Sequence, residues 1–151
     1  MIRPELVHLN LQGKERDEVL LELVTFLKKA GWISKEKELL SRLSQREDLG
    51  STAIGDGVAI PHCKLKSVKE PILLLAVSQQ GVNFLAPDGS MSHIFFLVVS
   101  SPDNPSLNLQ ILAGVAHLVR KAEDLMKRFL QAPDAEAVVR IVQEEEKRLH
   151  E

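Results

Sequence analysis

One histidine, His62, ends a stretch of the chain whose residue types could carry nucleophilic chemistry. The stretch, residues 44–64, reads SQREDLGSTAIGDGVAIPHCK. Pro61 fixes its own φ and biases Ile60 toward extended backbone, so His62 follows a stiffened segment. A histidine held in this way, with a neutral ring nitrogen facing solvent, can act as a nucleophile. The pattern therefore indicates a loop that presents one reactive imidazole.

Transfer of a phosphoryl group through His62 would require in-line access and hydrogen-bond donors for the phosphoryl oxygens. Arg46 lies 16 residues upstream and offers a planar fork that suits phosphate. Ser51 and Thr52 offer hydroxyl groups. Asn108 falls in the first turn of a predicted helix, where free backbone N–H groups and the positive end of the helix dipole favour an anion. Together these residues predict an anion pocket around the histidine.

Other kinds of site fit the sequence less well. The remaining histidines, at positions 8, 93, 117 and 150, show no spacing typical of metal ligands, so neither a metal nor a cofactor is expected. Gly50, Gly55 and Gly57 form neither a dinucleotide-binding nor a P-loop motif, and instead predict turns. A small hydrolase would need a serine- or carboxylate-based nucleophile arrangement, and the sequence offers none.

Cys63 directly follows His62, which raises the possibility of a thiol–imidazole pair. Neighbouring residues of an extended segment point to opposite sides, so the two side chains are not expected to meet. The simpler interpretation is that Cys63 fills a position for a small residue. A second hypothesis is that this thiol, next to a functional loop, is oxidisable.

Composition narrows the class of protein. The chain has 151 residues, of which 44% are hydrophobic and 26% charged, and its net charge of −2 gives no footprint for nucleic acid or an anionic membrane. A single cysteine excludes an intramolecular disulfide framework and favours a reducing compartment. No apolar leader or membrane-length apolar run is present. We therefore expect a cytoplasmic protein that does not insert into the membrane.

Hydrophobic periodicity predicts alternating strands and helices. Strands are expected over residues 7–11, 53–54, 58–60, 72–78 and 93–100, and helices over 14–30, 34–48, 122–131 and from 134 onward, with a further helix starting near residue 106. Ser34 is expected to open the second helix, and Leu109 to lie on the core side of the third. Hairpin-length loops at residues 55–57 and 87–89 predict a mixed sheet. The expected fold is a single α/β domain, residues 1–151, with a mixed β-sheet flanked by helices.

The run REDLGSTAIGDGVAIPHCK resembles the signature of the mannitol/fructose-type (type 2) EIIA domains of the bacterial phosphotransferase system. The family pattern is a Ser/Ala-Arg-Glu followed by G-[ST]-[ST]-x-[IL]-G-x-[GS]-[IV]-A-[IV]-P-H. The resemblance extends over almost the whole chain, and a free-standing domain of this length is most similar to the nitrogen-regulatory branch. It implies a mixed sheet flanked by helices.

The resemblance also implies roles for residues and partners. His62 would accept phosphate through Nε2 from HPr or a similar small histidine phosphocarrier protein, which makes the chain a phosphotransferase component. Arg46 matches the active-site arginine of the family. The phosphate would pass to a downstream acceptor such as EIIB, in sugar transport, or serve as a signal, as in nitrogen regulation. An alternative is a regulatory module that controls a transporter, kinase or transcription factor by protein contact without transferring phosphate.

One departure from the family pattern concerns the third helix. The family usually has a second histidine at its start, in a segment like HLQxLA, and here the segment is NLQILA, beginning at Asn108. Asn108 keeps a hydrogen-bond donor but cannot become cationic, so it loses pH-dependent charge support for a phosphoryl group. We therefore expect the departure to affect the rate and stability of phosphorylation more than its site.

Overall fold

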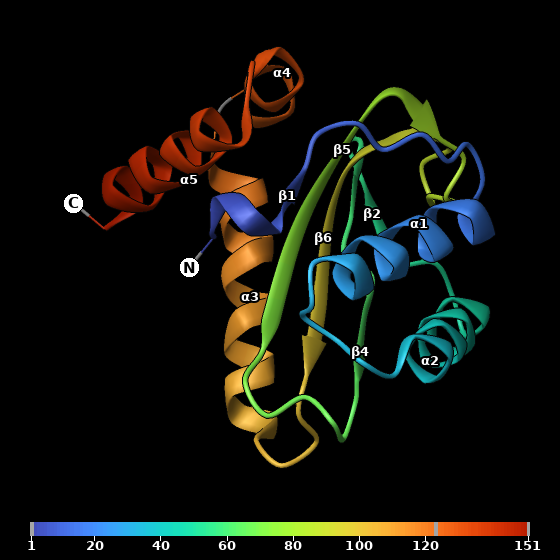
Figure 1. Ribbon diagram of the computed structural model, residues 1–151. Coiled ribbons are helices and arrows are strands. Elements are labelled where there is room, and N and C mark those ends of the chain that lie inside the picture. Colours follow the sequence, from blue (N-terminus) through green and yellow to red (C-terminus); the bar gives the residue numbers. More distant parts are fainter. Residues whose placement is uncertain (1, 123, 151) are drawn as a thin grey trace.

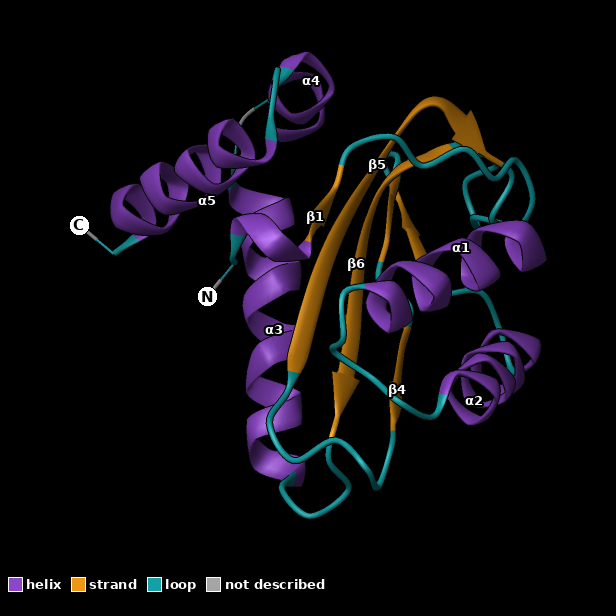
Figure 2. Ribbon diagram, in the orientation of Figure 1, coloured by secondary structure: helices purple, strands orange, loops and turns teal. Residues whose placement is uncertain are grey.

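The structure is a computed structural model that describes residues 2–122 and 124–150. A central sheet lies between two layers of helices (Figure 1, Figure 2). Its six strands run in the order β1-β5-β6-β3-β2, and β4 pairs with β6 outside this path. The strands are β1 (Val7–His8), β2 (Ala53–Gly55), β3 (Val58–Ala59), β4 (His62–Lys64), β5 (Ile72–Val82) and β6 (Ser92–Ser100).

Two helices cover one face of the sheet and three cover the other (Figure 1). The first pair packs its leucines against one side of β5 and β6, and the other three helices pack against the opposite side. A short 3₁₀ helix, η1 (Pro4–Leu6), precedes β1. The helices are α1 (Arg16–Lys29) and α2 (Glu36–Asp48) on the first face, and α3 (Pro105–Lys121), α4 (Leu125–Gln131) and α5 (Ala135–Leu149) on the second.

The sheet is mixed, as predicted. β5 and β6 form a long antiparallel pair, and β2 and β3 form a short antiparallel hairpin around the turn at residues 55–57. The β1, β3 and β4 strands each run parallel to their neighbour in the centre of the sheet. The predicted α/β class with helices on both sides is therefore confirmed.

The apolar runs of β5 and β6 reflect burial on both faces. Alternate residues of each strand belong to two separate hydrophobic cores, so Leu74 packs toward α1 and α2 and Leu75 packs toward α3, α4 and α5. In β6, Phe95 and Phe96 divide in the same way. A strand that is covered on both faces carries a continuous apolar sequence rather than an alternating one.

Four local expectations differ from the structure. The sequence predicts His62 on a loop, but it is the first residue of the strand β4, because residues 62–64 pair with the end of β6. The first strand extends only over Val7–His8, not to residue 11, because β1 pairs with β5 only through Val7 and His8. The second helix begins at Glu36, and its N-cap position is Lys35 without a side-chain cap, so Ser34 does not open it. Leu109 is 68% exposed rather than buried, because the first turns of α3 lie near the end of the sheet.

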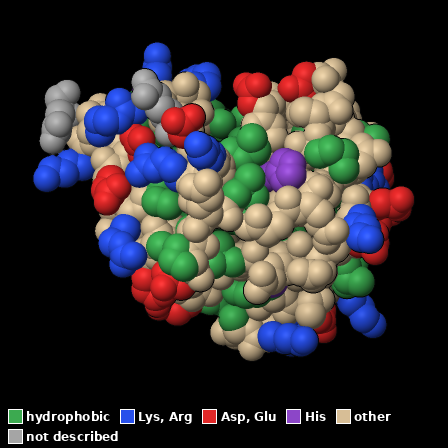
Figure 3. Space-filling model, turned by 90° about the horizontal axis from the view of Figure 1, so that it is seen from above, with side chains coloured by type: hydrophobic (Ala, Val, Ile, Leu, Met, Phe, Trp, Pro, Cys, Tyr) green, Lys and Arg blue, Asp and Glu red, His purple; other side chains and the backbone are tan. Residues whose placement is uncertain are grey.

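Ion pairs join α4 to α5. Glu145 of α5 is only 5% exposed, and its carboxylate accepts hydrogen bonds from Arg128 Nη1 at 2.8 Å and Arg148 Nε at 2.7 Å. Charged side chains of both signs gather over this part of the surface (Figure 3). The hydrogen bond from Arg148 is the main cause that holds the pKa of Glu145 below its ordinary value, against the opposing effect of burial.

Replacement of Glu145 should therefore destabilise the fold in a pH-dependent way. Because the folded-state pKa is lowered, the ionised carboxylate stabilises the protein above its unfolded-state pKa, and this contribution is lost as the pH falls. We expect Glu145→Gln to lower the free energy of unfolding by about 1–3 kcal/mol at pH 7. Urea unfolding followed by circular dichroism at a series of pH values measures this difference, which should shrink below about pH 4.

Glu144→Gln is the matched control. Glu144 also pairs with Arg128, at 3.1 Å, but its side chain is mostly exposed, so its removal should cost less than about 0.5 kcal/mol. Equal effects of the two substitutions, or a difference that does not change with pH, would contradict the role given to Glu145.

Candidate functional site

A cleft of 430 Å³, which we call the His62 cleft, lies at the edge of the sheet. It is formed by the C-terminal half of α2, the strand β4, the end of β6 and the first turns of α3. His62, Arg46 and Asn108, which come from three distant parts of the sequence, all line it. The other lining residues are Arg42, Gln45, Leu49, Cys63, Lys64, Val98, Ser100 and Leu112.

The pairing of β4 with β6 presents His62 to this cleft. β3 and β4 both run parallel to β6 along the same edge, and Pro61 separates them. His62 lies opposite Val98, whose backbone N–H donates to the Pro61 carbonyl oxygen at 3.0 Å. Cys63 packs against the core on the α1 and α2 side. Since neighbouring strand residues alternate, His62 is directed to the other side, where α3 begins.

A hydrogen bond to the backbone fixes the tautomer of His62. Its Nδ1 lies 2.7 Å from the carbonyl oxygen of Ile60, and a carbonyl oxygen can only accept. Nδ1 must therefore carry the proton, which leaves the lone pair of the neutral ring on Nε2. The geometry thus prepares Nε2 as the nucleophilic atom of the imidazole.

Three cationic side chains line the same cleft as the histidine, and the lining residues include no aspartate or glutamate. Arg46 donates through Nη1 to the Gly50 carbonyl oxygen at 3.0 Å, a contact that leaves its other N–H groups for a ligand. Arg42 lies one turn earlier on the same helix, and Lys64 follows on β4. This charge distribution favours an anion in the cleft.

Asn108 is held at the base of α3. It is 5% exposed, and its Nδ2 donates to the Ser101 carbonyl oxygen at 2.8 Å. Among the described residues, its Oδ1 has no hydrogen-bond partner. Asn104 caps the helix by accepting from Leu107 N at 3.2 Å, which fixes the position of this first turn. Asn108 therefore keeps a second amide N–H that could be donated to a ligand, while its buried carbonyl oxygen is left without a partner among the described residues.

Ser51 and Thr52 do not line the cleft. The hydroxyl of Ser51 donates to the Phe84 carbonyl oxygen, and the hydroxyl of Thr52 donates to the buried carboxylate of Glu47. Glu47 also accepts from the backbone N–H of Thr52 at 2.9 Å. These contacts tie the end of α2 to the start of β2 and thereby set the position of Arg46. In this structure the two hydroxyls hold the loop together and do not face an anion at His62.

Cys63 is poorly suited to act as a reactive thiol. Burial raises its pKa to about 12, so the group is protonated at neutral pH and is a weak nucleophile. Its side chain packs against the core and does not pair with the neighbouring histidine. This supports the interpretation of Cys63 as a small core-facing residue and argues against its being readily oxidised.

No group of three or more His, Cys, Asp or Glu side chains in residues 2–122 and 124–150 could hold a metal ion. Within the same residues, no helix has the length and apolar character needed to cross a membrane.

Sequence reasoning missed several residues of the site. Arg42 could have been found, because residues four apart share a face of a helix and Arg46 was already a candidate. Lys64 could have been found from strand alternation, which puts it on the same side as His62. The role of Glu47 had no local signal, since it depends on the turn that brings Thr52 back to the helix.

Comparison with known proteins places these features in a family. Residues 1–145 match the family model described as the phosphoenolpyruvate-dependent sugar phosphotransferase system, EIIA 2. The chain is 31% identical to the fructose-specific EIIABC component of Bacillus subtilis over 93% of its own length, and it spans 22% of that longer protein. It is also 31% identical to a nitrogen regulatory protein of Bradyrhizobium diazoefficiens, over 94% of this chain and 92% of the relative.

A solved structure shares the fold. The crystal structure of the nitrogen regulatory protein IIA-Ntr from Neisseria meningitidis superposes with a TM-score of 0.84, at 24% sequence identity. The match covers 93% of this chain and 94% of that one. Together with the family match across most of the sequence, this leads to one conclusion: the chain belongs to the EIIA type 2 family of the phosphoenolpyruvate-dependent sugar phosphotransferase system.

Proposed function

We propose that this protein is a phosphoryl carrier that accepts phosphate on His62 from an HPr-like phosphocarrier protein. The observation that carries the proposal is the His62 cleft, in which an imidazole of fixed tautomer lies among three cationic side chains and the start of α3. The membership of the chain in a family of phosphotransferase components supports it.

The reaction is a single exchange of one N–P bond for another. The lone pair of His62 Nε2 attacks the phosphorus of the phosphohistidine on the carrier, and the N–P bond of the carrier breaks as the new bond forms. The carrier imidazole leaves with the electron pair of the broken bond. The Nδ1–H of His62 remains bonded to the Ile60 carbonyl oxygen and stabilises the positive charge that develops on the ring.

Arg46 and Asn108 would bind the equatorial oxygens of the group in transfer. Arg46 retains N–H groups beyond the one donated to Gly50, and Asn108 retains one N–H beyond the one donated to Ser101. We assign Ser51 and Thr52 a different part from the one expected from the sequence. They would act indirectly, by fixing the loop between α2 and β2.

Exposed leucines beside the cleft favour a protein over a small molecule as the phosphoryl donor. Leu49, which lines the cleft, is 85% exposed, and Leu109, next to Asn108, is 68% exposed. Large exposed apolar side chains close to polar groups are typical of surfaces that dock with another protein.

After transfer, the phosphate would pass to an EIIB-type acceptor or act as a signal. The first possibility is suggested by the fructose-specific relative, whose name, EIIABC component, includes an EIIB part together with EIIA. The second follows from the nitrogen regulatory relative, of which this chain covers 92%. As a second candidate function, the protein would regulate a transporter, kinase or transcription factor by contact, and the neutral Asn108 favours this role because it weakens support for rapid transfer.

The deciding experiment is phosphorylation with phosphoenolpyruvate, enzyme I and an HPr-like carrier. Wild-type protein should incorporate phosphate in an acid-labile form, and His62→Ala should reduce incorporation to background because the nucleophile is gone. Intact-mass spectrometry measures both. His117→Ala is the control, since that histidine is exposed on α3 and does not line the cleft. Equal incorporation by His62→Ala and wild type would refute the assignment.

Restoring a titratable group at position 108 should speed the reaction. A charge-assisted hydrogen bond exceeds a neutral one by ~1 kcal/mol, so Asn108→His should raise the rate about fivefold to tenfold. The imidazole introduced is cationic only below its pKa, near ~6.5 when unperturbed, so the ratio of variant to wild-type rate should be highest near pH 6 and decline toward pH 8. Rapid-quench phosphorylation at each pH gives the ratio, and a constant ratio near one would count against this role.

The docking role of Leu109 can be separated from chemistry. Leu109→Asp should raise the KM for the carrier about tenfold, because an apolar contact of ~1.5 kcal/mol is lost, with a smaller effect on kcat. Steady-state kinetics with varied carrier concentration measures both constants. Leu21→Asp is the matched control: that residue is 53% exposed on α1, a helix that contributes no residue to the cleft, whereas Leu109 directly follows Asn108 of the cleft. The same rise in KM for both variants would exclude a local docking surface.

A further inference from the structure

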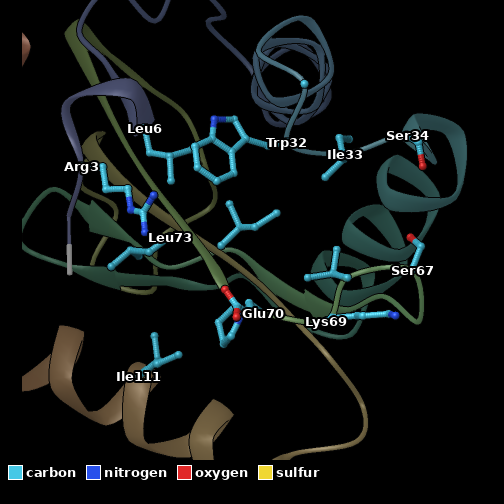
Figure 4. Close-up of a pocket in the computed structure, with 14 residues that line it drawn as sticks. Arg3, Leu6, Trp32, Ile33, Ser34, Ser67, Lys69, Glu70, Leu73 and Ile111 are labelled. Carbon is cyan, nitrogen blue, oxygen red and sulfur yellow. The ribbon is translucent and has the colours of Figure 1, made fainter.

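A second hollow, which we call the Trp32 pocket, is lined on one side by Ile111 of α3, a helix that also contributes to the His62 cleft. It has a volume of 520 Å³, within the range of about 300–1,000 Å³ that is typical of small-molecule sites. Figure 4 shows Arg3 and Leu6 at one end of the pocket, Ser34 and Ser67 at the other, and Trp32 between them.

The wall of the Trp32 pocket has an apolar part and a polar part. The apolar part consists of core residues whose outer sides remain slightly exposed, together with the indole of Trp32, and the polar part consists of serine and charged side chains. The pocket forms where β5 loses its neighbour, because β1 pairs with β5 at Leu75 and Ala76 and does not reach Ile72 or Leu73. The gap beside this part of the sheet edge leaves room for a ligand with an apolar body.

Two side chains of opposite charge border the apolar part of the pocket. The guanidinium of Arg3 lies 5.8 Å from the centroid of the Trp32 ring, and the carboxylate of Glu70 lines the same pocket. Figure 4 shows both groups directed toward the region beside Leu73, whereas Lys69 extends away from them. Within residues 2–122 and 124–150, neither Arg3 nor Glu70 forms a salt bridge. Each therefore keeps its capacity to bind a charged group.

We propose that the Trp32 pocket binds a small organic zwitterion with an apolar side chain, such as a free apolar amino acid. Arg3 would bind the carboxylate through two N–H groups, and Glu70 would accept from the ammonium group. The apolar side chain would lie against Trp32 and the residues at the sheet edge. A simple organic anion fits less well because Glu70 would repel it, and a simple amine fits less well because Arg3 would repel it.

A ligand bound in the Trp32 pocket would change the positions of side chains in the His62 cleft. The consequence of this change for phosphoryl transfer rests on the function proposed for that cleft. Ile111 of α3 lines the Trp32 pocket, and Asn108 and Leu112, on the same turns, line the His62 cleft. Among the described residues, the buried ones of α3 are Asn108, Val115 and Leu118, so Asn108 is the buried contact that ties the first turns of the helix to the rest of the fold.

The sheet connects the same two hollows. Leu73 of the Trp32 pocket pairs with Val98, and Val98 pairs in turn with His62. A ligand in contact with Ile111 would therefore move Asn108, on the same helix, relative to the imidazole of His62. The imidazole itself is only two strands away from Leu73 in the sheet. Such a shift changes the binding of the phosphoryl group and hence the rate of transfer.

The test of binding uses the unphosphorylated protein and the fluorescence of Trp32, which is the only tryptophan in the chain. L-leucine and L-phenylalanine should change the emission with saturation below about 10 mM. Phenylpropionate, which lacks the ammonium group, and phenethylamine, which lacks the carboxylate, should bind about tenfold more weakly than L-phenylalanine. No saturable change with either amino acid, or equal binding of phenylpropionate and L-phenylalanine, would overturn the proposal.

Charge variants locate the site. Arg3→Gln should weaken binding of L-phenylalanine about tenfold, and Glu70→Gln should abolish the preference for L-phenylalanine over phenylpropionate. Lys69→Gln is the matched control: it removes a charge from the same rim and should change affinity less than about twofold. All three side chains are exposed, so the variants should fold normally. Affinities unchanged in Arg3→Gln and Glu70→Gln would place the ligand elsewhere and refute the site.

The coupling between the Trp32 pocket and the His62 cleft is measured in a separate experiment. The rate of phosphorylation by the carrier is compared with and without saturating L-phenylalanine. A change of rate in wild type that is lost in Arg3→Gln supports the proposal, and an unchanged rate at saturation overturns the coupling. Absence of phosphorylation without any ligand would refute the proposed function instead, and the fluorescence titration would still decide whether the pocket binds a zwitterion.

Discussion

The pairing of β4 with the last residues of β6 is the contact on which the site depends. It sets His62 opposite Val98 at the edge of the sheet, and strand alternation then directs Cys63 into one core and His62 away from it. The same end of β6 leads through only a few residues into α3, so the first turn of that helix must lie near the histidine. Arg46 arrives independently, on a helix whose end is tied to β2 by Glu47.

The polar residues at the site use their hydrogen-bonding groups in two different ways. Side chains that face the cleft, such as His62 and Arg46, keep hydrogen-bonding capacity for a ligand, while buried groups behind them use theirs on the fold. Glu47 and Thr52 satisfy one another, and Ser51 binds the Phe84 carbonyl oxygen. A buried carboxylate can be tolerated there because its oxygens accept both the N–H and the hydroxyl of Thr52. Asn108 belongs partly to each kind: its amide nitrogen donates to the fold, and its oxygen has no partner among the residues that the structure describes.

Much of this could be predicted from the sequence. The mixed α/β sheet followed from hydrophobic periodicity and hairpin-length loops, and the attention to His62 followed from the proline before it and the motif around it. Contacts between distant residues were harder, because they depend on strand register that the sequence does not encode locally. Helical spacing alone put Leu109 on the core side of α3, yet no core lies beneath that turn. Likewise, closeness in sequence brought Ser51 and Thr52 into the candidate pocket, although local hydrogen bonds turn both hydroxyls elsewhere.

The strand that presents the histidine is also an edge of the sheet, which has a consequence for self-association. Open edges with unpaired backbone groups invite other chains to add strands, and proteins that aggregate often do so there. β4 has only three residues, begins directly after Pro61 and ends in the charged Lys64, so it offers little template for another strand. The edge beside His62 can thus stay open to solvent while resisting uncontrolled polymerisation through its backbone.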